Sequence, residues 1–243
     1  MGRIVRIGTA GWQLPKGLQD KVPNKSSQLE RYATRFNAVE VNSTFYRLPR
    51  LSTVERWAAS VPHDFRFALK LPRRITHELQ LRNISEPLAT FLDVVAAFGP
   101  RMGPVLVQLP PKLEFNEDIE DLLMRLCENA LGTVVIEPRH SSWFTRDVEA
   151  LMNRLRIARV AADPPRAADD GIPAGHPAMA YIRLHGTPRI YWSAYEEDAL
   201  RSWAGVARAA MHRSDEVWMI FDNTAAGAAA LNALDMQRLM ENE

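Results

Sequence analysis

The stretch Ala38-Val39-Glu40-Val41-Asn42 decides the fold, because its side chains alternate between apolar and polar in the manner of a β-strand. Val39 and Val41 lie on one face of this strand, and Glu40 and Asn42 lie on the other. The valine face suits packing against helices, whereas the opposite face must meet other polar groups. The stretch therefore predicts a barrel strand whose charged side chain points toward the barrel axis.

Short apolar runs bounded by glycine and proline recur along the 243 residues, and helical periodicity occupies most of the intervals between them. Such alternation implies a parallel sheet, and eight units averaging about thirty residues match an α/β fold, a single (β/α)8 TIM-like barrel over residues 1–243. A doubly wound open sheet is the competing architecture, but no glycine-rich dinucleotide turn supports it. The expected strands are Ile4–Thr9, Ala38–Tyr46, Phe65–Leu71, Pro104–Leu109, Thr133–Arg139, Arg159–Asp163, Met179–His185 and Val217–Asn223.

Two local features refine this expectation. Thr145 is placed to cap the helix that carries Val148 and Leu151 on one face. The segment Pro164–Pro177 contains four prolines and two glycines, which predicts an irregular loop instead of a full helix between strands six and seven.

Polar residues gather near the carboxyl ends of seven of the eight expected strands, which is the face where barrel enzymes place their active sites. Alternation on each strand turns the following side chains toward the axis: Glu40, Asn42, Lys70, Gln108, Glu137, Arg139, Arg183 and His185. Asp163 ends the sixth strand, and the Asp222-Asn223 pair ends the eighth without showing which of the two points inward. Acidic and basic members balance one another, so the set can be a functional site or a charge network that only supports the barrel.

The overall composition excludes some partners. The chain has 30 basic and 29 acidic residues and a net charge of +1, which gives no case for extended duplex or membrane binding, so any anion site must be local. One cysteine, Cys127, lies among leucines at helical spacing and is expected to be a buried, unreactive side chain. No signal-peptide run and no membrane-length apolar run occurs, and we expect a cytoplasmic protein.

Several blocks of the sequence recur together in one order along the chain. They are Gly8–Trp12, Phe36–Tyr46, Phe67–Lys70 with Ile75–His77, Gln108–Pro111, Glu137–His140 with Trp143-Phe144, Arg183–Gly186, Phe221–Asn223, Gly227-Ala228 and Asn232–Leu234. In order and in number they resemble the signature blocks of the DUF72 (YecE-like) family. The resemblance covers residues 8 to 234 and implies a TIM-like barrel whose biochemical function is not established. The chain departs from the family pattern in a shorter segment Gln13–Lys25, in Asp222-Asn223-Thr224 and at Ala226.

Three kinds of chemistry fit the polar set. Metal-free acid–base catalysis would use Glu40 and Glu137, with His185 as a proton shuttle. Anion binding would use the guanidinium forks of Arg139 and Arg183, with Lys70 nearby. A divalent metal is the third alternative, with ligands drawn from Glu40, Glu137, Asp163, His185 and Asp222, but only one histidine points inward and cations flank the carboxylates.

We therefore expect an enzyme of the hydrolase or isomerase type that acts on a small polar, sugar-like or phosphorylated ligand without a cofactor or a metal. Glu40, Glu137 and His185 are the expected catalytic residues. A non-catalytic protein that binds a nucleotide or a nucleic-acid backbone is the alternative, and nucleic acid is the less favoured partner. The expected ligand-binding residues are Asn42, Tyr46, Lys70, Gln108, Arg139, Arg183, Asp222 and Asn223. Of the aromatic side chains, Trp12, Trp143, Tyr191 and Trp192 are candidates for stacking on a ligand, and Phe45 is expected to pack outward.

Overall fold

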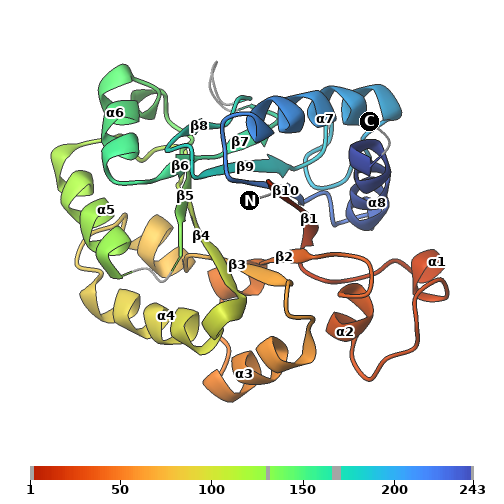
Figure 1. The fold of residues 1–243 in the computed structure, drawn as a ribbon. Coiled ribbons are helices and arrows are strands. Elements are labelled where there is room, and N and C mark those ends of the chain that lie inside the picture. Colours follow the sequence, from red (N-terminus) through yellow and green to blue (C-terminus); the bar gives the residue numbers. More distant parts are fainter. Residues whose placement is uncertain (1–2, 130–131, 166–170, 242–243) are drawn as a thin grey trace.

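The computed structural model describes residues 3–129, 132–165 and 171–241, and in it a ring of strands is surrounded by helices (Figure 1). The strands are β1 (Ile4–Ala10), β2 (Ala38–Val41), β3 (Arg66–Lys70), β4 (Met102–Gln108), β5 (Val134–Glu137), β6 (Ala158–Arg159), β7 (Ala161–Asp163), β8 (Ala174–Gly175), β9 (Met179–Leu184) and β10 (Glu216–Phe221). The helices are α1 (Lys16–Gln19), α2 (Gln28–Tyr32), α3 (Leu51–Ser60), α4 (Ser85–Ala97), α5 (Glu117–Asn129), α6 (Arg146–Arg154), α7 (Glu197–Met211) and α8 (Ala228–Glu241). Short 3-10 turns are η1 (Asn42–Phe45), η3 (Gly99–Arg101) and η4 (Ser141–Trp143), and η2 (Arg74–Glu78) is a π-helical turn.

The sheet closes on itself through its sixth strand. Parallel pairing runs in the order β9, β10, β1, β2, β3, β4, β5, β6, and β7 pairs with β9. Only Val160 separates β6 from β7, and its amide donates to the carbonyl of Ile136 on β5 at 2.9 Å. Together β6 and β7 therefore form one interrupted strand that joins β5 to β9, and the fold is the expected TIM-like barrel.

Strand alternation produces two apolar layers. Inside the barrel lie apolar side chains of varied size such as Ala68, Leu106 and Trp218, while Phe67 and Leu69 belong to the layer between strands and helices. The barrel interior is therefore filled with side chains at its amino-terminal end, and the polar residues are confined to the opposite end.

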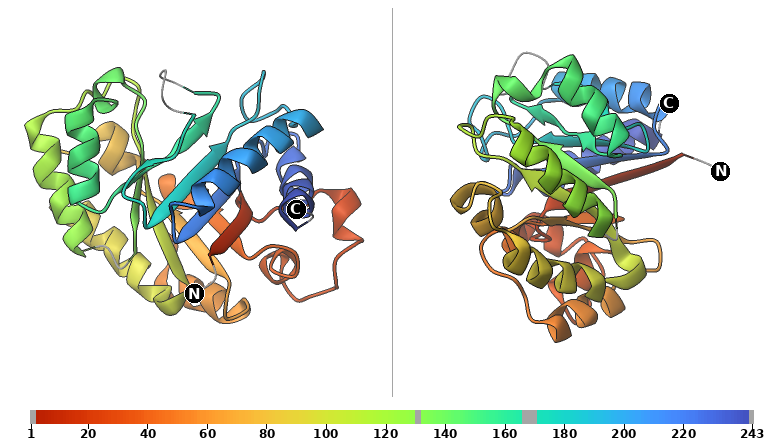
Figure 2. Two further views of the ribbon diagram at one scale, coloured as in Figure 1. Left: turned by 45° about the horizontal axis from the view of Figure 1, so that its top comes forward. Right: turned by 90° about the vertical axis from the view of Figure 1, so that its left-hand side faces the viewer.

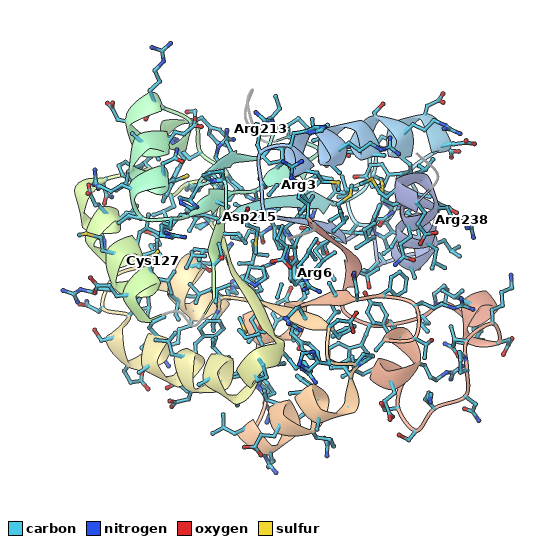
Figure 3. All side chains as sticks on the ribbon, viewed as in Figure 1. Arg3, Arg6, Cys127, Arg213, Asp215 and Arg238 are labelled. Carbon is cyan, nitrogen blue, oxygen red and sulfur yellow. The ribbon has the colours of Figure 1, made fainter. Side chains whose placement is uncertain are left out.

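The amino-terminal end of the barrel is closed by Arg6, which is labelled near the centre of Figure 3. Its guanidinium pairs with Glu216, donates to the carbonyl of Asp64 at 2.8 Å and lies 5.8 Å from the ring centroid of Trp218. Because these contacts satisfy the buried charge of Arg6, we interpret its role at this end of the barrel as structural.

Capping begins two of the helices as the sequence indicates. The Thr145 hydroxyl accepts from the amide of Val148 at 3.3 Å, as expected from the sequence, and begins α6. The Ser27 hydroxyl accepts from the Glu30 amide at 3.2 Å and begins α2. Helix α8 lies beside the segment that carries α1 and α2 (Figure 2), and Gln237 donates to the Arg35 carbonyl there at 3.0 Å.

One expected strand differs from the sequence-based prediction, and one expected loop agrees with it. The second strand ends at Val41 instead of Tyr46, because η1 begins at Asn42 and turns the chain; Thr44 donates to the carbonyls of Val41 and Lys70. The segment from 164 to 177 carries no helix in its described part, as expected, and its β8 pairs antiparallel with β6. Residues 166–170 of this segment lie outside the described residues.

No helix in the described part of the chain is both long and apolar enough to span a membrane.

Candidate functional site

Arg183 is the centre of a buried charge cluster at the carboxyl ends of the strands. Alternation on β9 turns it toward the axis, and three carboxylates from three other parts of the barrel surround it. Its Nε and Nη2 donate to Glu40 at 3.0 and 2.7 Å, its Nη1 donates to Glu137 at 2.5 Å, and Nη2 also donates to Asp222 at 3.0 Å. The side chains of Arg183, Glu40 and Glu137 are 0% exposed, so these ions are wholly desolvated.

The other carboxylate oxygen of Glu137 accepts further hydrogen bonds. Gln108 on β4 donates to Glu137 Oε1 at 2.7 Å, and Arg139 donates to the same atom through Nε and Nη2 at 3.2 and 3.0 Å. Arg139 is 12% exposed, so its guanidinium lies between the buried carboxylate and solvent. The two arginines therefore hold Glu137 from below and from above.

His185 and Asp222 form a pair beside this core. His185 Nδ1 lies 2.9 Å from Asp222 Oδ2, and His185 Nε2 lies 3.6 Å from Glu137 Oε1. Asn42 donates to Asp222 Oδ1 at 3.3 Å, while Asn42 Oδ1 is buried without a donor among the described residues. The ring of Tyr191 meets His185 edge-on at 5.7 Å between centroids. The imidazole is thus held in one orientation by groups on both ring nitrogens.

Lys70 ends β3 on the same inward face and is 7% exposed. Its Nζ lies 4.3 Å from the ring centroid of Phe45 in η1. Burial and the nearby Arg183 lower the pKa of the Lys70 amine to about 8. The ring of Phe45 also meets His77 of η2 edge-on, at 5.1 Å between ring centroids, and burial and the charge of Lys70 lower the pKa of His77.

Within the cluster, the surrounding charges shift the pKa values of the carboxyl groups and of His185 in opposite directions. Burial alone would raise the pKa values of Glu137 and Asp222, but Arg183 and His185 outweigh it and lower both. Burial and Arg183 oppose charging of His185, yet Glu137 and Asp222 outweigh them and raise its pKa above the ordinary 6.5. Near neutral pH the site therefore combines ionised carboxylates with a histidine that is readily protonated.

Most of the expected site residues meet in this cluster, and two do not. Tyr46 is 79% exposed and its ring packs against Phe45. Asn223 turns away from the axis, where its amide donates to the Ser193 carbonyl and to Asn232 at 2.9 Å each and supports the loop before α7. Those that meet are Glu40, Asn42, Lys70, Gln108, Glu137, Arg139, Arg183, His185 and Asp222.

Three side chains outside the expected catalytic and ligand-binding sets complete the site. Strand alternation places Tyr181 on the inward face with Arg183, and its hydroxyl donates to Glu40 at 2.9 Å. Phe45 was expected to face outward, but η1 turns it against Lys70. Tyr191 was considered only for stacking on a ligand, and it also touches His185.

The ligand set considered for a metal is not assembled. Asp163 accepts from the hydroxyls of Tyr195 and Thr187 at 2.6 and 2.8 Å, and the other carboxylates are bonded to Arg183. Across residues 3–129, 132–165 and 171–241, no group of three or more His, Cys, Asp or Glu side chains is arranged to hold a metal ion.

Comparison with known proteins places the chain in a family. The UPF0759 protein YecE of Escherichia coli (strain K12) is 32% identical over 154 residues, which cover 62% of this chain and 54% of YecE, so the match spans about half the length of that relative. The UPF0759 protein YunF of Bacillus subtilis (strain 168) is 22% identical over 275 residues, covering 99% of this chain and 96% of YunF.

Solved structures share the fold. A DUF72 family protein of Thermotoga maritima MSB8 superposes with a TM-score of 0.81 at 24% identity, covering 98% of this chain and 100% of that one. A DUF72 family protein of Enterococcus faecalis V583 gives 0.81 at 22% identity, covering 99% and 96%. A family model described as "Protein of unknown function DUF72" matches residues 6–243. Because that match spans nearly the whole sequence, the chain belongs to the DUF72 family.

Proposed function

We propose that the protein is an enzyme that performs metal-free acid–base chemistry on a small polar, anionic ligand at the carboxyl-terminal mouth of the barrel. The observation that carries the proposal is the His185–Asp222 pair at 2.9 Å, embedded in a cluster that raises the pKa of one partner and lowers that of the other. Two titratable groups pushed apart by their surroundings are the usual basis of an acid and base pair.

The roles follow from access. Glu40 and Glu137 are 0% exposed and wrapped around Arg183, so in this proposal they position the charged groups instead of meeting the ligand. His185 donates and accepts the proton, and Asp222 orients its ring.

Charge favours an anionic ligand. Within the cluster, Glu40, Glu137 and Asp222 are balanced by Lys70, Arg139 and Arg183, so a protonated His185 leaves one positive charge in excess. Arg139 and Lys70 are 12% and 7% exposed, and they lie nearer to solvent than the two glutamates. A phosphate or carboxylate group of the ligand would complete this balance.

The first test is thermal unfolding with phosphate, sugar phosphates, hydroxy acids and nucleotides added singly. A ligand present at about a hundred times its dissociation constant stabilises the folded state by about 2.7 kcal/mol. We expect a stabilised midpoint with a small anionic compound, lost in Arg139→Gln and kept in the control Arg201→Gln, which changes an exposed pair on α7. No shift with any of these compounds would overturn the proposal.

The second test separates catalysis from binding. With a compound that binds, we expect His185→Gln to weaken but retain the thermal shift and to lose turnover, because Arg139 and Lys70 still attract the anion but the variant cannot carry the proton. Loss of the shift together with turnover would instead support a non-catalytic binding protein.

A further inference from the structure

Lys70 differs from every other cation of the cluster in having no carboxylate partner. Arg183, Arg139 and His185 each contact at least one carboxylate oxygen of Glu40, Glu137 or Asp222. Lys70 Nζ, in contrast, forms no ion pair or hydrogen bond with any residue of the described chain, and its nearest recorded contact is the face of Phe45 at 4.3 Å. Glu40, Glu137 and Asp222 therefore act on this ammonium only from beyond ion-pair distance, so its charged form is less stabilised than that of the paired arginines.

The backbone beneath Lys70 is held firmly. It ends β3, where the Thr44 hydroxyl donates to its carbonyl at 2.7 Å and its own strand pairs with Leu106 of β4. The ring of Phe45 covers one side of the side chain and limits its movement. The amine is therefore presented from a rigid strand end toward the cluster, as a covalent catalyst requires.

The groups that face Lys70 come from five elements. Arg183 on β9 and burial disfavour its charged form, Glu40, Glu137 and Asp222 favour it, and His77 of η2 lies close enough for its own pKa to respond to the charge of Lys70. The balance lowers the pKa of Lys70 to about 8. Roughly a tenth of such amines are unprotonated at pH 7, which is about 300-fold more than for an ordinary lysine.

We propose that Lys70 is the nucleophile of this site and forms an imine with the carbonyl group of a small anionic aldehyde or ketone. This inference rests on the proposed function and names its substrate class. A desolvated lysine beside another cation is the usual form of an imine-forming amine.

The step balances without a further reactant. The Lys70 Nζ lone pair attacks the carbonyl carbon, and the carbonyl π electrons move to oxygen, which takes a proton from His185. His185 then takes a proton from the nitrogen and returns it to the hydroxyl group. That group leaves as water while the nitrogen lone pair forms the carbon–nitrogen double bond of a protonated imine. One water is released, and nothing is oxidised or reduced.

Reductive trapping tests the proposal directly. The protein is incubated with pyruvate, dihydroxyacetone phosphate or the uncharged glyceraldehyde in turn, then with sodium cyanoborohydride, and the adduct is located by peptide mass spectrometry. We expect the two anionic compounds to label Lys70 at least about tenfold more than the exposed Lys112, with labelling that rises to a midpoint near pH 8. Pyruvate against the phosphorylated ketone distinguishes a carboxylate-bearing substrate from a phosphate-bearing one.

Two variants control the experiment. Lys70→Met removes the amine and Lys70→Arg keeps the positive charge, so both should lose the adduct. Labelling spread evenly over exposed lysines, or unchanged labelling of either variant, would overturn the proposal.

A measurement on the unaltered protein keeps the test independent of variant folding. Trace acetic anhydride in competition with a free amine reports the reactivity of each lysine, and Lys70 should acylate with a midpoint near pH 8 while Lys112 does not. A Lys70 midpoint above 10 would overturn the imine proposal. A thermal shift with inorganic phosphate, which has no carbonyl group, would still support the acid–base anion site, so the two failures are distinguishable.

Discussion

At the scale of single residues, Arg183 is the residue around which the buried carboxylates of the site are arranged. It bonds three carboxylates, two of which are 0% exposed. Arg183→Met removes the cationic partner of Glu40 and one cationic partner each of Glu137 and Asp222, and breaking buried pairs in this way costs about 3–5 kcal/mol of unfolding free energy. Denaturant unfolding at pH 7 measures the loss, and Arg201→Met, which removes an exposed pair with Glu197, should cost at most about 0.5 kcal/mol.

The cost of Arg183→Met should depend on pH. In the unaltered protein the pKa values of Glu137 and Asp222 lie below their ordinary 4.5 and 3.8, so their contribution is present above those values and is lost as the pH falls through the folded ones. Without Arg183 the same carboxylates protonate more readily, and the difference between the two proteins should shrink from pH 7 to pH 5. A difference that stays constant over this range would contradict the account.

The contribution of His185 to the free energy of unfolding should depend on pH with the opposite sign. Its folded pKa is raised above 6.5, so its contribution to stability is complete below 6.5 and is lost as the pH rises through the folded pKa. We expect the unaltered protein to lose stability over that interval relative to His185→Gln, by about 1.4 kcal/mol for each unit of pKa difference. Unfolding at several pH values measures this, and an NMR titration of His185 with a folded pKa under 6.5 would refute it.

The sequence predicted which residues point inward more reliably than it predicted how they meet. Alternation placed Glu40, Glu137 and Arg183 on the axis, since a period of two follows from strand geometry alone. It did not show that one guanidinium bridges carboxylates from several strands, because that depends on strand stagger around the barrel. At Asp222-Asn223 alternation was ambiguous, and the structure turns Asp222 inward.

At the scale of elements, the contact between β1 and β2 depends on Gly8. A Cβ at this position would lie 2.0 Å from the carbonyl oxygen of Ala38 and 3.0 Å from the Tyr32 hydroxyl. Because both strands are held in the barrel, Gly8→Ala should destabilise the protein by about 1–3 kcal/mol or more. Gly205→Ala is the matched control in α7, where a Cβ meets nothing within 4 Å, and it should stabilise by about 0.5–1 kcal/mol. Equal effects in denaturant unfolding would contradict this reading of the strand contact.

Element boundaries show where sequence patterns lose their power. The polar, aromatic run from Asn42 to Tyr46 has strand-like composition, yet the chain turns at Asn42 because Thr44 satisfies the carbonyls of Val41 and Lys70 with its hydroxyl. That turn moves Phe45 against Lys70 and leaves Tyr46 in solvent. The prolines and glycines between strands six and seven were easier to interpret than the run from Asn42 to Tyr46, because prolines within a segment exclude a regular helix.

At the scale of the whole molecule, the barrel carries an arginine at each end with different surroundings. Arg6 at the amino-terminal end is satisfied by Glu216 and by backbone carbonyls. Arg183 at the other end is satisfied only by side chains of the candidate site. The difference places charge that is paired by side chains at the carboxyl-terminal face, which is where barrel proteins carry their functional loops.

Strand pairing around the barrel is least extensive at the interrupted sixth strand, which is here called the seam of the barrel. β6 pairs with β5 at two positions and β7 pairs with β9 at three, whereas β1 and β10 pair at six. We expect hydrogen exchange in residues 158–163 to be at least about tenfold faster than in residues 216–221, because fewer backbone hydrogen bonds must open. Mass spectrometry of peptides that cover the two strands measures the ratio, and equal protection would show that the barrel opens only as a whole.

Arg183 also bridges this seam, because its guanidinium on β9 bonds Glu137 on β5 at 2.5 Å, above the interrupted strand between them. Arg183→Met removes that bridge while leaving the pairing of β1 with β10 intact. Exchange in residues 158–163 should therefore accelerate by a larger factor than exchange in residues 216–221, since only the first segment loses a local restraint in addition to global stability. Acceleration of both peptides by the same factor would mean that the cluster stabilises the barrel uniformly; unequal acceleration would mean that the charge cluster and barrel closure depend on the same contact.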